Sequence, residues 1–187
     1  MNSNSPSKSA GILWTDLLLV AFLIGFDALA RIVVHVPNFS PVLASALFAG
    51  TVLLNRPLAL LVPVAALLLS DAVLGFDDWR IAAVVYLSLV LPAVVGIVSR
   101  RFRVSRMLVP AVLSCSLIFF VTTNFAVWVF SGIYATDMQG LVQCYVAALP
   151  FLQYTVAGDL VWAAILSGGA WLVQATFART RLRSSVA

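Results

Sequence analysis

Long apolar stretches separated by short polar segments make up almost the whole chain. Spanning a membrane takes a helix of about 20 mostly apolar residues. Phe39–Leu54 is short for such a span, and Gly140–Leu149 is predicted as a short interfacial helix before the last one. The pattern predicts an all-α membrane protein, a bundle of about six transmembrane helices. The predicted spans are Ile12–Val34, Phe39–Leu54, Leu58–Phe76, Ile81–Val98, Met107–Phe130 and Phe151–Phe177.

Composition supports this class and leaves little room for a domain outside the membrane. Of the 187 residues, 63% are hydrophobic and 10% charged, whereas roughly half of an ordinary soluble domain is apolar. We therefore expect one domain with short ends. Residues 1–10 are predicted to be a disordered tail, 11–178 the six-helix transmembrane domain, and 179–187 a basic cytoplasmic tail.

The basic residues predict the orientation of the bundle. Cytoplasmic loops of membrane proteins carry an excess of Lys and Arg. With both termini in the cytoplasm, nine basic residues lie inside and two, Arg31 and Arg80, lie outside. Because the basic residues flank apolar runs, they indicate topology and not nucleic-acid binding. The nine are Lys8, Arg56, Arg100, Arg101, Arg103, Arg106, Arg179, Arg181 and Arg183.

Polar residues within the predicted spans gather towards the outer side. Polar groups inside a membrane usually face the bundle interior and mark pathways or sites. A pocket with apolar walls and a few convergent polar groups is typical of a small-molecule site. We therefore predict an outward-facing substrate pocket, with membrane lipid around the bundle. Its candidate residues are His35, Asn38, Phe39, Asp71, Trp79, Asn124, Trp128, Tyr154 and Asp159.

Each candidate also has a structural interpretation. Asp27 and Arg31 are four residues apart and would neutralise each other on one helix. Asp71 and Asp159 would staple helices through backbone contacts, and Asn124 would link two helices.

The remaining candidates have structural alternatives as well. Trp79, Trp128 and Tyr134 fit an aromatic belt at the membrane interface. His35, next to a proline in a loop, fits a structural hydrogen bond better than a metal ligand.

Several motifs are missing from the sequence. It has no GxxxxGK[ST] phosphate-binding loop, and one histidine without any glutamate cannot build a familiar hydrolase or metalloprotease site. We predict no enzyme activity, metal or cofactor. Two pairs of small residues at spacing four, Ala21 with Gly25 and Ala46 with Gly50, allow close helix contact. Contact within the bundle is the favoured interpretation, and a docking face for another membrane subunit is the alternative.

Three segments carry a resemblance to a known family. They are His35–Gly50, Ser70–Phe76 and Pro150–Asp159. They resemble an uncharacterised bacterial membrane family that is similar to the substrate-binding S-components of energy-coupling-factor (ECF) vitamin transporters. The resemblance implies six helices in the bacterial cytoplasmic (inner) membrane and uptake of a vitamin-like micronutrient. Its partner would be an ECF energising module, or none.

The solitary cobalamin-transporter branch of that superfamily is the nearer resemblance. Asp78-Trp79-Arg80 followed by Tyr86 and Pro92 resembles the region where some members carry a cobalt-coordinating cysteine. Arg80 stands at that position here, so the resemblance suggests cobalamin or a related compound as substrate without thiolate–cobalt chemistry. The competing hypothesis is a membrane scaffold or assembly protein that has no small-molecule substrate.

Overall fold

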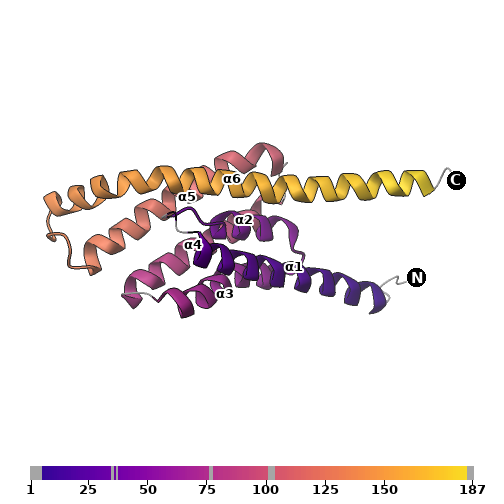
Figure 1. Cartoon of the computed structure of the whole chain (residues 1–187), viewed down its shortest axis with the longest axis horizontal. Coiled ribbons are helices and arrows are strands. Elements are labelled where there is room, and N and C mark those ends of the chain that lie inside the picture. Colours follow the sequence, from indigo (N-terminus) through magenta and orange to yellow (C-terminus); the bar gives the residue numbers. More distant parts are fainter. Residues whose placement is uncertain (1–5, 35, 37, 76–77, 101–103, 185–187) are drawn as a thin grey trace.

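The computed structural model describes the backbone of residues 6–34, 36, 38–75, 78–100 and 104–184. It describes the side chains of residues 13–34, 36, 38–75, 78–100 and 108–176. Within these residues the chain forms six α-helices and no β-strand, which confirms the predicted all-α class (Figure 1). The helices are α1 Pro6–Val33, α2 Val42–Val52, α3 Arg56–Leu74, α4 Trp79–Ser99, α5 Val104–Phe130 and α6 Met138–Ser184.

Four of these helices are long and apolar enough to cross a membrane. They are α3, α4, the Leu108–Phe130 part of α5 and the Met138–Thr176 part of α6. Their outer faces carry many exposed leucine, valine, isoleucine and phenylalanine side chains. The eleven residues of α2 span only about 16 Å, about half of the hydrocarbon core of a bilayer. The prediction of a second span over Phe39–Leu54 is therefore wrong, because Pro41 and the extended Leu53 bound a much shorter helix.

The short helix α2 lies at the centre of the bundle and packs against all five other helices. Its contact with α4 is the closest, because Gly50 and Gly96 face each other without side chains. A Cβ atom on Gly50 would lie 2.3 Å from the carbonyl oxygen of Ala93, which is too close for any real side chain. Ala46 and Gly50 are buried, so this pair packs within the bundle as expected.

The other small-residue pair lies on an open surface. Ala21 and Gly25 on α1 are exposed, and a Cβ atom on Gly25 would have no neighbour within 4 Å. The preferred interpretation of contact within the bundle is therefore wrong for this pair. Small residues allow close contact but do not themselves supply the neighbouring helix.

The last helix is longer than the sequence suggested. The separate interfacial helix predicted at Gly140–Leu149 is wrong, because α6 continues through Pro150 as one helix of 47 residues. Proline is tolerated inside apolar helices when neighbouring groups and small local adjustments accommodate the lost backbone hydrogen bond. Figure 1 shows α6 along the length of the molecule.

Both ends of the chain extend the helices beyond the predicted domain boundaries. α1 begins at Pro6, inside the segment expected to be a disordered tail, and proline suits the first turn of a helix. At the other end, α6 continues to Ser184, past the boundary predicted at residue 179.

Both termini lie at one end of the molecule, and the α5–α6 connection lies at the other (Figure 1). We call these the terminal end and the hairpin end. Polar contacts close the bundle near the terminal end. The Asp16 carboxylate accepts a hydrogen bond from the backbone of Asn55 at 3.1 Å. Arg100 donates to the carbonyl oxygens of Gly50, at 2.6 Å, and Leu53. The Arg100 contacts cap the end of α2 and hold it to α4, and the Asp16 contact holds the α2–α3 connection to α1.

Candidate ligand-binding cavity

A cavity of about 450 Å³ lies between the helices, on the side of α2 that faces the hairpin end. Every helix contributes to its lining, and so does the segment between α1 and α2. The lining residues are Arg31, Val34, Val36, Asn38, Phe39, Ser40, Val42, Leu43, Leu74, Val85, Leu89, Phe119, Thr155 and Asp159. Apolar side chains form most of this wall, and a few polar groups project among them. The volume falls within the usual range for small-molecule sites.

An aromatic cluster supports the cavity from α1 and α6. The ring of Phe39 lies 6.0 Å from that of Trp162, which meets Phe26 edge-on at 5.4 Å. Gly158 lets the chain at Phe39 approach α6, since a Cβ atom there would lie 3.1 Å from the Phe39 ring. Packing between these aromatic rings therefore fixes the segment that precedes α2.

The polar wall contributed by α1 is built on an ion pair. Arg31 donates to the Asp71 carboxylate at 2.8 Å, and the second carboxylate oxygen accepts from the Tyr86 hydroxyl at 2.9 Å. The side chains of Arg31 and Asp71 are 23% and 10% exposed, so water screens the pair only in part. Asp71 is not itself among the lining residues, but its ion pair holds Arg31, which lines the cavity.

Asp159 is the acidic residue that lines the cavity. Only 3% of it is exposed, and one carboxylate oxygen accepts a 2.6 Å hydrogen bond from Ser116 on α5. Ion pairs in the described part of the chain join Arg31 to Asp71 and Arg80 to Asp78. Asp159 therefore has no basic partner among the described side chains.

A second buried carboxyl group lies outside the cavity. Asp27 is fully buried on α1 and accepts a 2.6 Å hydrogen bond from Ser45 on α2, while its other oxygen has no partner. The ion pair of Arg31 is with Asp71 and not with Asp27. Arg31 lies one turn further along α1 and reaches across to Asp71 on α3.

The structure separates the predicted site residues into three groups. Asn38, Phe39 and Asp159 line the cavity, and Asp71 lies one contact behind it. Trp79, Asn124, Trp128 and Tyr154 are not among the lining residues. His35 lies outside the described residues.

The four residues away from the cavity have other surroundings. Trp79 is 71% exposed and Tyr154 43% exposed. Asn124 donates to the carbonyl oxygen of Phe120 on its own helix. Trp128 donates to the carbonyl oxygen of Ala135 in the α5–α6 connection at 2.9 Å. Asn124 therefore bonds its own helix and not a neighbouring one, and Trp128 ties α5 to the α5–α6 connection.

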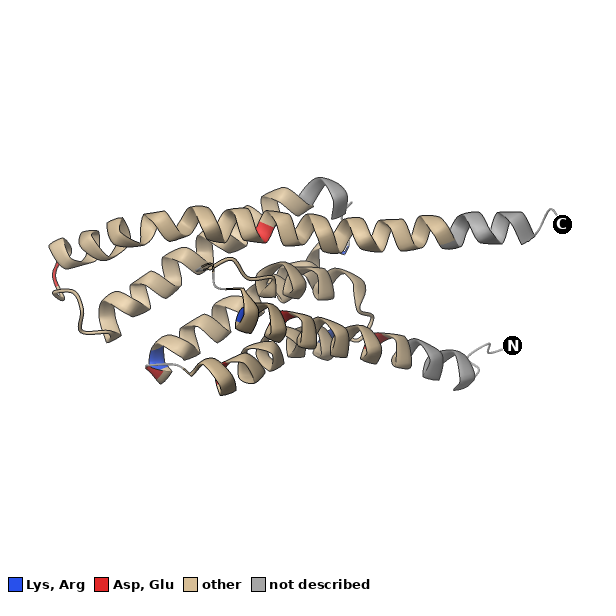
Figure 2. Cartoon of the chain, viewed as in Figure 1, with Lys and Arg blue, Asp and Glu red and all other residues tan. Residues whose placement is uncertain are grey.

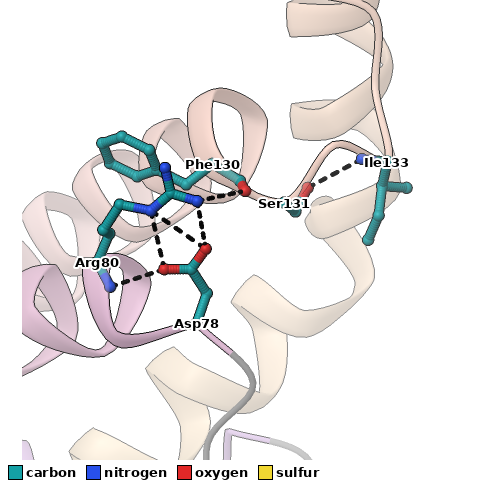
Figure 3. A network of polar contacts seen from close by, with 5 residues as sticks. All are labelled: Asp78, Arg80, Phe130, Ser131 and Ile133. Carbon is teal, nitrogen blue, oxygen red and sulfur yellow. Dashed lines mark hydrogen bonds and ion pairs between the residues drawn. The ribbon is translucent and has the colours of Figure 1, made fainter.

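A separate polar network joins α4 to α5 at the hairpin end (Figure 3). Asp78 caps α4 by accepting from the backbone of Arg80 at 2.7 Å, and the Arg80 side chain donates back to it at 2.7 Å. The Arg80 guanidinium also lies 4.8 Å from the centre of the Phe130 ring. The hydrogen bonds from the side chain and backbone of Arg80 lower the pKa of Asp78 to about 2. Arg80 thus holds two helices together and does not line the cavity.

Several lining residues were not among the sequence candidates. Arg31 was noted as a basic residue of the outer side and as a neighbour of Asp27, and Ser40 and Thr155 are common polar residues without a distinctive motif. Phe119 and Leu89 belong to uniformly apolar runs, where every position is similar in character. The available sequence signal for Arg31 was its position in the predicted span, which places it towards the outer side, as Asp71 is. Among the described residues, no group of three or more His, Cys, Asp or Glu side chains could hold a metal ion.

The fold and cavity define an all-helical protein with four helices suited to a membrane and a central, mostly apolar cavity. Figure 2 shows how few charged residues its described helices carry. The chain belongs to the family described as Family of unknown function (DUF6580), whose model matches residues 12–182. Comparisons with curated proteins and with solved structures give no match.

Proposed function

We propose that this chain is a multi-pass protein of the bacterial cytoplasmic membrane that takes up a small, vitamin-like molecule without changing it chemically. The cavity carries this proposal. It has the size of a small-molecule site, its wall draws on all six helices, and it joins an apolar surface to a few buried polar groups.

The exposed surface supports insertion in a membrane. Large apolar side chains such as Leu68, Leu87, Leu117 and Phe125 are exposed on α3, α4 and α5, and soluble monomers rarely expose wide apolar patches. α1 is long enough to span as well, at about 42 Å for its 28 residues. Its acidic residues Asp16 and Asp27 are turned into the bundle. In this arrangement α2 is a half-length helix enclosed by the others.

The arrangement of the ends supports an outward-facing cavity. The two termini share one end (Figure 1), and the basic residues of the sequence favour that end as the cytoplasmic one. The cavity then lies on the outer side of α2, while the contacts of Arg100 and Asp16 close the cytoplasmic side. A molecule would enter from outside and stop at α2.

The cavity volume limits the size of the proposed substrate. A space of about 450 Å³ suits a molecule of the size of a simple vitamin. Cobalamin is several times larger, so the volume favours a smaller compound over it. Release to the cytoplasm requires an opening on the other side of α2, powered by an ECF-type energising module or by the substrate gradient.

A membrane scaffold without a substrate is the second candidate, favoured by the open α1 surface at Ala21 and Gly25. Native mass spectrometry of the detergent-purified protein, after incubation with bacterial extract, separates the two. Uptake predicts a bound small molecule that is lost when Leu43→Trp fills the cavity, while Gly25→Leu on the open surface keeps it. Recovery of a stable protein partner together with an empty cavity in every preparation would support the scaffold.

A further inference from the structure

The polar groups of the cavity indicate which chemical class of molecule it binds. We propose that the ligand is an organic cation whose charged group faces Asp159. This inference rests on the proposed small-molecule function and adds the charge of the ligand to it.

Arg31 does not provide a free positive charge in the cavity. Its guanidinium is paired with Asp71 at 2.8 Å, and the Tyr86 hydroxyl fixes the other oxygen of that carboxylate. The pair is neutral as a unit. A ligand anion would have to compete with Asp71 for Arg31, so the cavity offers little to a negatively charged group.

Asp159 can still accept hydrogen bonds from a ligand. Among the described residues, the hydrogen bond to its side chain comes from Ser116 and occupies one of the two carboxyl oxygens. A hydroxyl group satisfies hydrogen bonding at that oxygen but does not cancel a negative charge. Burying an unpaired carboxylate costs much free energy unless a positive group compensates it. Because Asp159 lines the cavity, a ligand can supply that group, whereas the fully buried Asp27 lies outside the lining.

The rest of the cavity wall is mostly aromatic and aliphatic. Phe39 and Phe119 offer aromatic surface, and valine and leucine side chains fill most of the remainder. Organic cations are attracted to aromatic faces as well as to carboxylates. A molecule with an apolar or aromatic body and one amine, amidine or cationic ring matches both features. A small inorganic cation would leave the apolar wall without contacts.

Benzylamine, benzamide and benzoate provide a test, because they share a ring and differ in charge. Thermal unfolding of the full-length protein in detergent is measured with each compound at several concentrations. We expect benzylamine to stabilise the wild-type protein more than benzamide, and benzoate not at all. Asp159→Asn should weaken benzylamine binding by about tenfold or more, since a direct charge contact contributes at least 1.4 kcal/mol.

Two variants control for folding and for the detergent. Asp159→Glu keeps the carboxyl group and should keep the preference for benzylamine. Asp27→Asn removes a buried carboxyl that lies outside the cavity lining and should leave the preference unchanged.

Other outcomes overturn the inference. Equal effects of benzylamine on wild type and Asp159→Asn, or preferential stabilisation by benzoate or benzamide, would contradict it. If native mass spectrometry then finds a neutral or anionic molecule in the cavity, the ligand class is wrong while the proposed uptake function survives. A cavity empty in every preparation would contradict the uptake function itself.

Discussion

The two halves of the bundle use their polar groups in opposite ways. Near the terminal end, Arg100 and Asp16 form hydrogen bonds with backbone groups of α2 and of the residues that follow it. Gly50 meets Gly96 there without an intervening side chain. Towards the hairpin end, the helices separate around a cavity, and Arg31 and Asp159 line it. Contacts to the backbone close the half near the terminal end, whereas the half near the hairpin end contains a cavity lined by polar side chains. In the proposed function, the first half seals the bundle and the second half binds the substrate.

The same contrast appears between two carboxyl groups of equal local geometry. Asp27 and Asp159 each accept one 2.6 Å hydrogen bond from a serine on a neighbouring helix. Asp27 is enclosed between helices, and Asp159 lines the cavity. The hydrogen bond alone therefore does not distinguish the enclosed carboxyl from the one at the cavity. Their positions relative to the cavity do.

The largest expected effect lies in the closed half. Gly50→Ala places a Cβ atom against the Ala93 carbonyl oxygen, where the backbone of α4 cannot easily yield. Overpacking of this kind costs about 3 kcal/mol of unfolding free energy, which thermal unfolding in detergent would reveal as a clearly lower Tm. Gly25→Ala is the matched control, because its Cβ would meet nothing. It should leave the Tm unchanged or raise it, and equal losses in both variants would contradict the close α2–α4 contact.

The ion pair at the cavity wall should give the next largest effect. Asp71→Asn keeps a partner for Tyr86 but leaves the positive charge of Arg31 partly buried without its counter-charge. We expect a loss of about 2 kcal/mol, in the range for an unpaired buried polar group. A double-mutant cycle with Arg31→Gln measures the coupling. Strictly additive losses would mean that the two side chains do not stabilise each other.

Removing the serine partners should separate the two carboxyl groups. Ser45→Ala leaves Asp27 without any hydrogen bond in an enclosed position, at a cost of about 1–2 kcal/mol. Ser116→Ala should cost less, because water or a ligand in the cavity can replace the hydroxyl at Asp159. Chemical unfolding of both variants under the same conditions gives the comparison. A larger loss of unfolding free energy for Ser116→Ala would mean that Asp159 is the enclosed carboxyl and Asp27 the accessible one.

The smallest effect is expected from the surface network of Figure 3. Hydrogen bonds from Arg80 lower the pKa of Asp78 to about 2 from an ordinary value of 3.8. The ionised cap therefore contributes stability above pH 4, and the contribution is lost as the pH falls from 4 towards 2. Asp78→Ala should reduce the slope of Tm against pH in that window and leave ligand binding intact. An unchanged slope would show that Asp78 does not contribute through its charge.

The apolar periodicity made the helical class predictable, because each long run admits only a helix in a membrane. It did not reveal the length of α2, since an apolar helix of eleven residues and a full span have the same composition. Nor did it show that α6 continues through Pro150, because proline usually ends a helix in water. Local pattern gives the type of element, but neighbouring helices decide where it stops.

The sequence could place some candidate residues by their position along the predicted spans. It placed Asp71 and Asp159 towards the outer side, and in the structure Asp159 lines the cavity while Asp71 lies directly behind it. Depth does not indicate which way a side chain points around its helix. Asn124 therefore turned out to contact its own helix, and Trp79 to be exposed. Ser116, which fixes Asp159, carried no signal because serine is common in apolar helices.

The proposed uptake function requires that the cavity opens to the outside of the cell. Thiol labelling of Ser40→Cys in intact cells tests this most directly, in a protein whose native Cys115 and Cys144 are replaced by alanine. Ser40 lines the cavity and is partly exposed, and Arg56 is exposed near the terminal end. We predict that a small membrane-impermeant thiol reagent modifies Ser40→Cys in intact cells, whereas Arg56→Cys reacts only after permeabilisation. Modification of Arg56→Cys in intact cells, with Ser40→Cys protected, would contradict an outward-facing cavity.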